Sequence, residues 1–485
     1  IMNLTFDTFR PLLPLAIVSL TAVLLMLAVA FRRNHWWNAT LAVVGLNLSL
    51  ITTIYLSIQS STGAVTGLLI VDQYAYFYSI VILVAALACC TLTHAFMESY
   101  QNNKEEIYLL LLMATAGALV LVYSHHMASF FIGLELLSVP VYGMIAYTHE
   151  RGRSLEAGIK YLVLSASASA FMLFGMALMY AQTGTLAFAS VGEQMAETSG
   201  HLATFGVAMI IIAVLFKLSL APFHLWTPDV YQGAPAPVGA FLATVSKVAV
   251  FAVLVRFLIE TPIQYTQPLQ KIFAVVAVLS IIFGNLLALT QTNIKRLLAY
   301  SSIAHFGYLL VALAAGGGTA LETIHVYLLT YVLTTLGAFG VITLMSTAGD
   351  SEDADSLQHY RGLFWRRPYL TAVMTVMMLS LAGIPLTAGF IGKFYVMLTG
   401  VNTGSWDLLA AVIIGSGIGL YYYLRVMVTL YMATPGMLRH DTAENWEQRA
   451  GGLMVLCVAG LVLLVGMYPQ PVLEWIRLAK PLFLH

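Results

Sequence analysis

Long apolar runs constrain this sequence more than any other feature. About fourteen stretches of roughly 20 mostly apolar residues follow one another, and short polar connections separate them. A helix of about 20 residues crosses the roughly 30 Å hydrocarbon core of a bilayer. The stretches lie at residues 12–31, 36–58, 73–97, 107–123, 127–147, 154–182, 203–222, 237–259, 270–289, 297–315, 321–347, 369–401, 406–433 and 451–468. They predict an all-α, polytopic membrane protein with about 14 transmembrane helices, a short helix from His224 to Tyr231 and an amphipathic tail.

The composition argues against other classes of protein. Hydrophobic residues make up 60% of the 485 residues and charged residues only 9%, whereas soluble domains carry roughly 25% charged residues. The formal net charge is zero, so no nucleic-acid partner is expected. Cys89, Cys90 and Cys457 lie in apolar runs without metal-ligand spacing, so neither an iron–sulfur cluster nor a zinc site is expected.

Basic residues gather in alternate connections, and this asymmetry predicts the orientation of the chain. One set of connections contains Arg32, Arg33, Lys104, Arg151, Arg153, Lys295, Arg296, Arg361, Arg366, Arg367, Arg439 and Arg449. The other set contains only Arg10, Lys271, Arg477 and Lys480. Because cytoplasmic connections carry the excess of Lys and Arg, the first set is expected in the cytoplasm and both termini in the periplasm.

Some ionisable residues fall inside the apolar runs, where a charge costs at least about 2.5 kcal/mol on insertion scales and usually marks a pathway. They are Glu135, Lys160, Lys217, Lys247, Arg256, Lys393 and Arg425. Glu135, Lys217, Lys247 and Lys393 lie too far from the helix ends to reach water, so a function is expected for them. Arg256 and Arg425 lie near helix ends, and we expect them to be anchors or to snorkel to the interface.

Proline interrupts two of these runs beside buried lysines. Pro222 follows Lys217 and is expected to deprive the carbonyl of Leu218 of its helical partner, and Pro385 is expected to do the same to Leu381. Unpaired backbone at membrane depth is tolerated only beside protein or a water-filled cavity. Broken helices beside charged groups also form the midplane ion sites of transporters. Two proline-broken helices that line an ion path are therefore predicted.

The spans also suggest an internal repeat. Five spans that begin near residue 107 can be set beside five that begin near residue 270, and the fourth span of each set is the broken one. Because each set has an odd number of spans, the second enters from the other side and the repeat is inverted. The predicted domains are three N-terminal helices (1–106), a first five-helix unit (107–259), a second, inverted unit (260–433), and a C-terminal helix with an amphipathic tail (434–485).

Buried lysines and carboxyls are suited to passing protons, because burial favours their neutral forms. A Glu–Lys pair keeps both groups charged, and parting them lets the lysine release its proton, so such a pair can gate transfer. His224 and His305 are candidate relays, since histidine titrates near neutral pH. A hydrogen-bonded packing role is the alternative for both and is favoured for His325. His125 and His126 are expected at the surface.

Three long motifs surround the broken helices. They read F-K-L-S-L-A-P-F-H-L-W-T-P-D-V-Y-Q-G-A-P-A-P-V-G-A-F-L-A-T-V-S at Phe216–Ser246, N-I-K-R-L-L-A-Y-S-S-I-A-H-F-G-Y at Asn293–Tyr308, and L-S-L-A-G-I-P-L-T-A-G-F-I-G-K-F at Leu379–Phe394. Together they resemble the antiporter-like subunits of complex I, the respiratory NADH:quinone oxidoreductase, over about residues 70–430. The W-T-P-D-V-Y-Q-G form resembles the bacterial N type (the mitochondrial subunit 2 type). Lysine at 393 differs from the M type, and the lack of a long lateral helix differs from the L type.

The resemblance implies a role for each buried residue. Glu135 and Lys217 would form the gating pair, Lys160 a relay on the cytoplasmic side, Lys247 the central lysine, and Lys393 the lysine of the second broken helix. Protons would then move from cytoplasm to periplasm, across the bacterial inner membrane, through a buried Glu/Lys/His chain.

The resemblance also implies that redox chemistry takes place in other subunits, where FMN, iron–sulfur clusters and quinone are expected. No cofactor or metal is expected in this chain, which has no GxGxxG after a strand and no P-loop. The expected partners are an M-type antiporter-like subunit, small membrane subunits and lipids. NADH and quinone would be reached only through the complex.

Two alternative functions compete with this interpretation. A subunit of a multi-subunit Na⁺/H⁺ antiporter shares the broken helices and lysines, but the W-T-P-D-V-Y-Q-G motif favours complex I. A membrane scaffold without transport would gain nothing from the cost of the buried charges.

Overall fold

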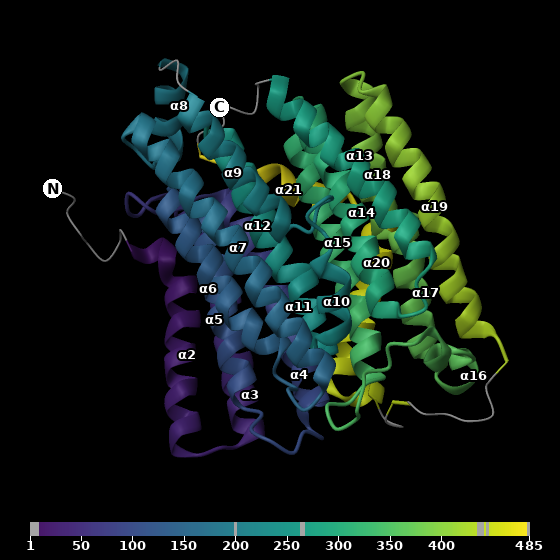
Figure 1. Ribbon diagram of the computed structural model, residues 1–485. Coiled ribbons are helices and arrows are strands. Elements are labelled where there is room, and N and C mark those ends of the chain that lie inside the picture. The colour runs from purple at the N-terminus through teal and green to yellow at the C-terminus, as the bar shows by residue number, and fades with distance from the viewer. Residues whose placement is uncertain (1–8, 198–200, 262–266, 434–440, 443–445, 483–485) are drawn as a thin grey trace.

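The computed structural model describes residues 9–197, 201–261, 267–433, 441–442 and 446–482, and they form a bundle of helices (Figure 1). The helices are α2 (Leu13–Phe31), α3 (His35–Ile58), α4 (Gln73–Met97), α5 (Glu106–Tyr123), α6 (Met127–Ile145), α7 (Gly152–Thr183), α8 (Phe188–Glu197), α9 (His201–Lys217), α10 (Trp226–Gly233), α11 (Ala236–Phe241), α12 (Lys247–Glu260), α13 (Gln267–Leu289), α14 (Ile294–Ala315), α15 (Ala320–Leu344), α16 (Leu363–Arg366), α17 (Pro368–Ala382), α18 (Ala388–Asn402), α19 (Trp406–Tyr431), α20 (Ala450–Met467) and α21 (Gln470–Leu478).

The prediction of an all-α, polytopic membrane protein is confirmed. Among the described residues, 12 helices are long and apolar enough to cross a membrane. Two shorter apolar helices, α9 and α17, are each followed by a further helix after a break. They are the two runs for which broken helices were predicted. A total of 14 spans depends on counting each broken helix as one span, so that number stays a prediction.

The first break lies earlier than the proline that was expected to cause it. Helix α9 ends at Lys217, five residues before Pro222, and Ser219 takes a positive φ of 63°. The Leu218 carbonyl was expected to lose its helical partner through Pro222, but the cause differs, because Leu218 already lies beyond the end of the helix. The indole nitrogen of Trp226 donates to the carbonyl of Phe216 at 3.0 Å and thereby ties α10 to the end of α9.

The second break uses a glycine. Helix α17 ends at Ala382, and Gly383 follows with a φ of 83°, a conformation that glycine adopts without steric cost. The backbone N–H of Gly383 donates to the carbonyls of Leu379 and Ser380, both at 3.0 Å. Leu381, whose carbonyl was expected to lose its helical partner to Pro385, lies in the last turn of α17. The neighbouring carbonyl of Ala382 accepts a hydrogen bond from a side chain, as described below.

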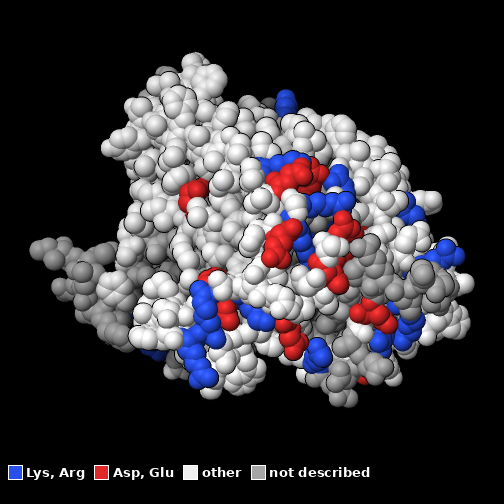
Figure 2. All heavy atoms as spheres, turned by 60° about the horizontal axis from the view of Figure 1, so that its bottom comes forward, with Lys and Arg blue, Asp and Glu red and all other residues white. Residues whose placement is uncertain are grey.

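The connections meet on two faces of the bundle. The Lys- and Arg-rich connections contact one another and form one face, the basic face, at the bottom of Figure 1. Direct contacts across it include Arg33–Glu106 at 2.7 Å and Arg151–Asp353 at 2.7 Å. Figure 2 shows charged side chains gathered on this face. On the opposite face, Arg477 contacts Glu322. Arg439 lies outside the described residues.

Three of the small elements that were not predicted lie near the sites described below. A two-stranded antiparallel hairpin, β1 (Gly63–Ala64) with β2 (Ile70–Val71), precedes α4. Helix α8 covers the opposite face between α7 and α9. Residues Leu242–Ser246 form a π-helical segment that joins α11 to α12 immediately before Lys247. Such segments are frequent at functional sites, because they widen the helix and leave backbone carbonyls less tightly paired.

The centre of the bundle is formed by α11–α12, α14 and α15. Nearly all residues of these helices are buried, whereas α2, α3, α13, α19 and α20 expose broad apolar surfaces. Helices α5 to α12 and α13 to α19 follow the order expected for the two units of the repeat. The domain boundaries themselves stay predictions.

Candidate functional site

Lys217 lies at the last position of α9, where the helix breaks. Its side chain is buried, and Nζ donates to Ser138 Oγ on α6 at 2.7 Å and to Ser165 Oγ on α7 at 2.5 Å. Nζ also lies 5.9 Å from the centre of the Tyr161 ring. Hydroxyl groups both donate and accept hydrogen bonds, so these serines can accommodate a charged or a neutral amine.

Glu135 is positioned on α6, one turn before Ser138. Its carboxylate accepts a hydrogen bond from Ser169 Oγ on α7. Among the described residues it forms no ion pair with Lys217, and serines occupy the hydrogen-bonding positions of both groups. The structure thus brings the predicted gating pair into one neighbourhood but holds the two charges apart.

Lys247 follows the π-helical segment and is buried at the centre of the bundle. Nζ donates to Ser302 Oγ on α14 at 2.7 Å, and Ser302 is bonded to Tyr331 Oη on α15 at 2.7 Å. Nζ lies 5.0 Å from the ring centre of Phe306 and 5.6 Å from that of Tyr231. Its surroundings are therefore hydroxyls and aromatic rings.

His305 lies one turn further along α14, where its ring packs against that of Tyr331. Its Nδ1 is 2.7 Å from Tyr327 Oη, and its Nε2 is 3.1 Å from Tyr423 Oη. The hydroxyl of Tyr423 also bonds Ser301. Both ring nitrogens thus face phenol groups, which can donate or accept, so the histidine can change its tautomer without losing partners.

Lys393 lies on α18 and reaches back to the second break. Nζ donates to the carbonyl of Ala382 at 2.9 Å and lies 5.4 Å from the ring centre of Tyr308. A cavity of about 10 Å³, about the size of one water, adjoins His305 and the break. It is lined by His305, Tyr327, Thr330, Tyr331, Thr334, Ser380, Leu381 and Gly389. The second break, His305 and Lys393 therefore form one polar region.

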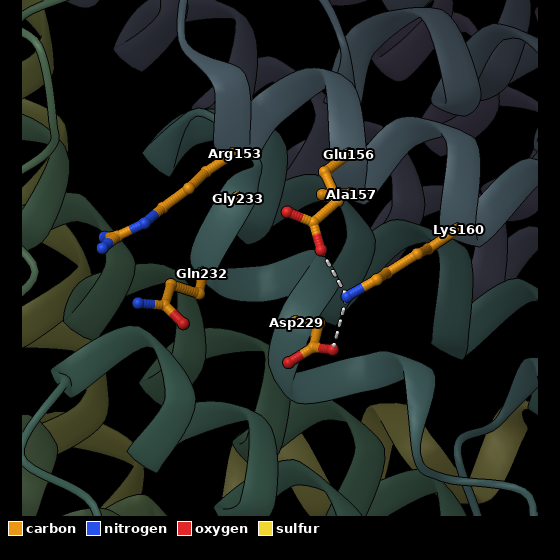
Figure 3. A pocket seen from close by; sticks show the side chains of 7 residues that line it. All are labelled: Arg153, Glu156, Ala157, Lys160, Asp229, Gln232 and Gly233. Carbon is orange, nitrogen blue, oxygen red and sulfur yellow. Dashed lines mark hydrogen bonds and ion pairs between the residues drawn. The ribbon is translucent and has the colours of Figure 1, made fainter.

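Lys160 differs from the other candidates because it is partly exposed on the basic face. Its Nζ lies 2.6 Å from Glu156 and 3.2 Å from Asp229, as Figure 3 shows. Asp229 in turn contacts Arg296 at 2.6 Å. These side chains line an open cavity of about 130 Å³. Lys160 thus lies at the mouth of the bundle rather than within it.

The predictions for the remaining histidines are confirmed only in part. His224 packs against Phe283, and its buried Nδ1 has no hydrogen-bond partner among the described residues, so no contact joins it to the lysines. His325 is surrounded by the rings of Tyr74, Phe77 and Tyr78, which agrees with a packing role. His125 and His126 were expected at the surface, and both are half-buried, so that expectation holds only in part. His125 also contacts the buried carboxylate of Glu260.

Arg256 is not the snorkelling residue that was expected. Its side chain is completely buried and forms a bidentate pair with Asp72, at 2.8 and 2.9 Å. Asp72 lies at the start of α4, so the pair anchors α12 to α4 instead. Arg425 does anchor its helix, since it donates to the carbonyls of Leu289 and Gln291 at the end of α13.

Several residues of these clusters were missed from sequence. The serines and tyrosines gave no signal, because hydroxyls are common in apolar helices. Glu260 could have been found from the sequence, because a carboxylate four residues after Arg256 on the same helix can pair with it. Within the part of the chain that is described, no group of three or more His, Cys, Asp or Glu residues could hold a metal ion.

Comparisons with known proteins place this geometry in a family. The family profile described as "NADH:quinone oxidoreductase/Mrp antiporter, TM" matches residues 124–419. Subunit N of the NADH-quinone oxidoreductase of Ectopseudomonas mendocina is 58% identical over 96% of this chain and 95% of its own length. The subunit N of Acinetobacter baumannii is 55% identical over 98% of this chain and 96% of its own.

Solved structures agree. A chain of respiratory complex I from Thermus thermophilus, solved with bound aureothin, has a TM-score of 0.81 and 33% identity, and covers 95% of this chain and 98% of its own. A chain of the Mrp complex from Dietzia sp. has a TM-score of 0.84 at 19% identity, covering 98% of this chain and 97% of its own. The second match shows a shared fold only.

Broken helices around buried lysines thus define an antiporter-like membrane protein. The chain belongs to the antiporter-like transmembrane subunits of NADH:quinone oxidoreductases, and within them to the N type. It is a membrane-arm subunit of a proton-translocating enzyme complex, and the alternative of a Na⁺/H⁺ antiporter subunit is less supported.

Proposed function

We propose that this chain carries protons from the cytoplasm to the periplasm through Glu135, Lys217, Lys247, His305 and Lys393. The observation that carries the proposal is the hydroxyl network at the centre of the bundle. Lys247, Ser302 and Tyr331 are joined by hydrogen bonds of 2.7 Å, and His305 lies one turn from Ser302. A scaffold would have no use for such buried polar groups, which are costly in a membrane.

The proposed direction begins at the basic face. The excess of Lys and Arg supports a cytoplasmic location for this face, and hence periplasmic termini. Lys160, Glu156 and Asp229 would exchange protons with the cytoplasm at the cavity in Figure 3. Lys217, buried behind Tyr161, would receive a proton from there, and its charge would depend on the distance to Glu135.

The second half of the path would run from Lys247 to Lys393. Each lysine has hydroxyl or carbonyl partners and no carboxylate within 4.0 Å among the described residues. A lysine without a fixed counter-ion is free to alternate between its two charge states. His224 has no contact that connects it to the path, so a relay role for it has the weakest support among the proposed sites.

The other parts of the enzyme would supply the energy. FMN, iron–sulfur clusters and quinone would be bound by other subunits, and this chain would hold no cofactor. An M-type antiporter-like subunit, small membrane subunits and lipids would cover the broad apolar surfaces of the outer helices. The bacterial inner membrane is the proposed location.

Substitution of Lys247 tests this function. Lys247→Met removes the titratable group but keeps much of the volume, and Lys247→Arg keeps a charge that cannot be released. We expect both complexes, reconstituted in vesicles, to translocate fewer protons per electron than the wild type. Lys271→Arg, on an exposed site of α13, is the matched control. An unchanged proton-to-electron ratio in both Lys247 variants would contradict the proposal.

A further inference from the structure

A second buried charge cluster lies on the opposite face, away from the lysine path. Arg256, near the end of α12, pairs with Asp72 and also approaches Glu260 at 3.5 Å. Glu260 is in turn 2.6 Å from Nδ1 of His125, in the connection between α5 and α6. Asp72, Arg256 and Glu260 are at most 1% exposed, whereas the His125 side chain is 18% exposed.

The charges of this cluster do not balance without an additional proton. Asp72 and Glu260 contribute two negative charges, and Arg256 contributes one positive charge that it cannot lose. Within these four side chains, a neutral His125 would leave a net charge of one negative unit among buried groups, which is costly. A protonated His125 makes the cluster neutral, and its Nδ1–H then forms a charge-assisted hydrogen bond with Glu260.

His125 is also the member that connects the cluster to water. It is the only one of the four side chains with appreciable exposure. Its backbone is held on both sides, because its N–H donates to Leu68 of the hairpin segment at 3.1 Å and its carbonyl accepts from Phe188 of α8 at 3.3 Å. The backbone contacts therefore hold the partly exposed imidazole beside Glu260.

We propose that His125 and Glu260 form a one-proton binding site that couples the contact between α4 and α12 to the pH at the opposite face. With the proton bound, Arg256 and Asp72 form a neutral pair beside a neutral His125–Glu260 pair. Without the proton, Asp72 and Glu260 compete for Arg256, and the ion pair between Asp72 and Arg256 weakens. The site thus senses the proton concentration on the face where, under the proposed function, protons are released.

Asp72 contacts three elements, which are α4, α12 and the C-terminal segment. Its Oδ1 caps α4 by accepting from the N–H of Ala75 at 2.8 Å, and its Oδ2 accepts from the N–H of Leu482 in the C-terminal segment at 3.1 Å. Arg256 lies nine residues after Lys247 on α12, about 14 Å along the helix axis. A change at the site therefore acts on the helix that holds the central lysine.

Other titratable groups near the site do not replace His125. Among the described residues they include Tyr74 and Tyr76 on α4, Arg10, His126, and His325, whose ring lies 5.5 Å from that of Tyr74 and away from Glu260. Tyrosine and arginine do not titrate near neutral pH. Burial lowers the pKa of His126, and the adjacent His125 lowers it further. Its Nδ1 also accepts from the N–H of Ala128 and caps α6.

Infrared difference spectra of the intact complex between about pH 8 and about pH 6 test the proton site. We expect His125→Asn, whose amide can still donate to Glu260, to lose one imidazole band that the wild type shows. The matched control is His126→Asn, in which asparagine can still cap α6; it should keep that band. Retention of every wild-type imidazole band in His125→Asn would overturn the proposal.

Hydrogen exchange tests the coupling without reliance on the His125 variant. In the wild-type complex, amides at the start of α4 should exchange more readily at about pH 8 than at about pH 6, beyond the intrinsic effect of pH on the chemical rate. In Glu260→Gln the Arg256–Asp72 pair is already balanced, so this excess should disappear. An excess that is absent from the wild type, or unchanged in Glu260→Gln, would overturn the coupling.

These measurements need neither NADH nor pumping. Their failure would leave the proposed proton path intact, and a failure of the Lys247 test would leave the site intact. Only the assignment of the sensed phase to the periplasm rests on the proposed function.

Discussion

Lys217, Lys247 and Lys393 share one chemical arrangement, unlike the buried Lys295, which is paired with Asp353. Lys217 has two serine hydroxyls as partners, Lys247 has one, and Lys393 has a backbone carbonyl. None has an ion-pair partner among the described residues. In contrast, the buried Arg256 is paired with a carboxylate. The distinction is physical, because an amine that must change its charge needs partners that suit both states, whereas a guanidinium needs a permanent counter-ion.

This arrangement predicts how substitutions of Glu135 and Lys217 affect proton pumping. We expect Lys217→Ala and Glu135→Ala each to slow proton transfer through this chain by about a hundredfold or more, the lower end of the range for loss of a positioned proton-transfer group. Lys217→Arg should be milder if charge alone matters at the gate, and Glu135→Asp should keep more activity than Glu135→Gln. The measurement is vesicle acidification per NADH oxidised, and assembled alanine variants with an unchanged ratio would defeat the gating role.

At the scale of elements, the breaks were located from sequence but their geometry was not. Proline and glycine within apolar runs mark the two interruptions correctly. The helix end at Lys217 could not be read from the chain, because it depends on Ser219 adopting a positive φ and on the Trp226 hydrogen bond. The π-helical segment before Lys247 likewise has no sequence signature, since it arises from packing against neighbouring helices.

The Gly383 position offers a test of the second break. A methyl group there would lie 2.7 Å from Cδ of Lys393, and the φ of 83° is unfavourable for any other residue. We expect Gly383→Ala to destabilise the chain by about 1–2 kcal/mol from the backbone alone, and to displace Lys393. Gly184→Ala is the matched control, because Gly184 has a φ of 66° but open space around it.

Thermal unfolding and proton pumping separate the two effects. Both glycine variants should lower the unfolding temperature, and only Gly383→Ala should also lower the proton-to-electron ratio. Equal pumping in the two variants would show that the position of Lys393 against the break is unimportant.

Asp353 ties the connections of the basic face together. It contacts Arg151 at 2.7 Å and Lys295 at 2.8 Å, and all three side chains are largely buried. Burial raises the pKa of Asp353, but the charges and hydrogen bonds of Lys295 and Arg151 outweigh burial, so its pKa lies below the ordinary value.

Removal of this carboxylate should be costly. We expect Asp353→Asn to lower the free energy of unfolding by about 3–5 kcal/mol, because two buried cations lose their counter-ion. A carboxyl with a depressed pKa stabilises the folded state above its unfolded pKa of about 3.9, and this contribution is lost as the pH falls through the lower, folded pKa. The difference between wild type and variant in denaturant should therefore persist at neutral pH and shrink only under strong acid. A difference that already vanishes at pH 6 would contradict the ion-pair account.

At the scale of the whole molecule, the sequence predicted the class, the breaks and the grouping of connections on two faces. Each of these features depends on local composition, which can be read directly from the sequence. The Asp72–Arg256–Glu260–His125 cluster was not predicted, because it joins four residues from three distant parts of the chain. The separation of Glu135 from Lys217 was also not predictable, since it depends on which serine rotamers the packing allows.

The orientation of the molecule in the membrane remains a prediction from its basic residues, and labelling can test it. We expect a cysteine at Ser351, an exposed position on the basic face, to react only with reagents on the cytoplasmic side. A cysteine at Thr62, exposed on the opposite face, should react only from the periplasm. The background is a chain in which Cys89, Cys90 and Cys457 are replaced. The reverse pattern would overturn the proposed orientation.

The central claim is that the buried lysines carry protons and do not merely supply charge. Lys393 best separates a proton-carrying role from a charge-only role. Among the described residues its Nζ donates a hydrogen bond only to a backbone carbonyl, and arginine can keep that bond. The most direct measurement is the proton-to-electron ratio of the assembled complex with Lys393→Arg, beside Lys393→Ala and the exposed control Lys271→Arg. We predict that both Lys393 variants lower the ratio while the control does not, since arginine cannot deprotonate. A Lys393→Arg complex that pumps as the wild type does would contradict this account.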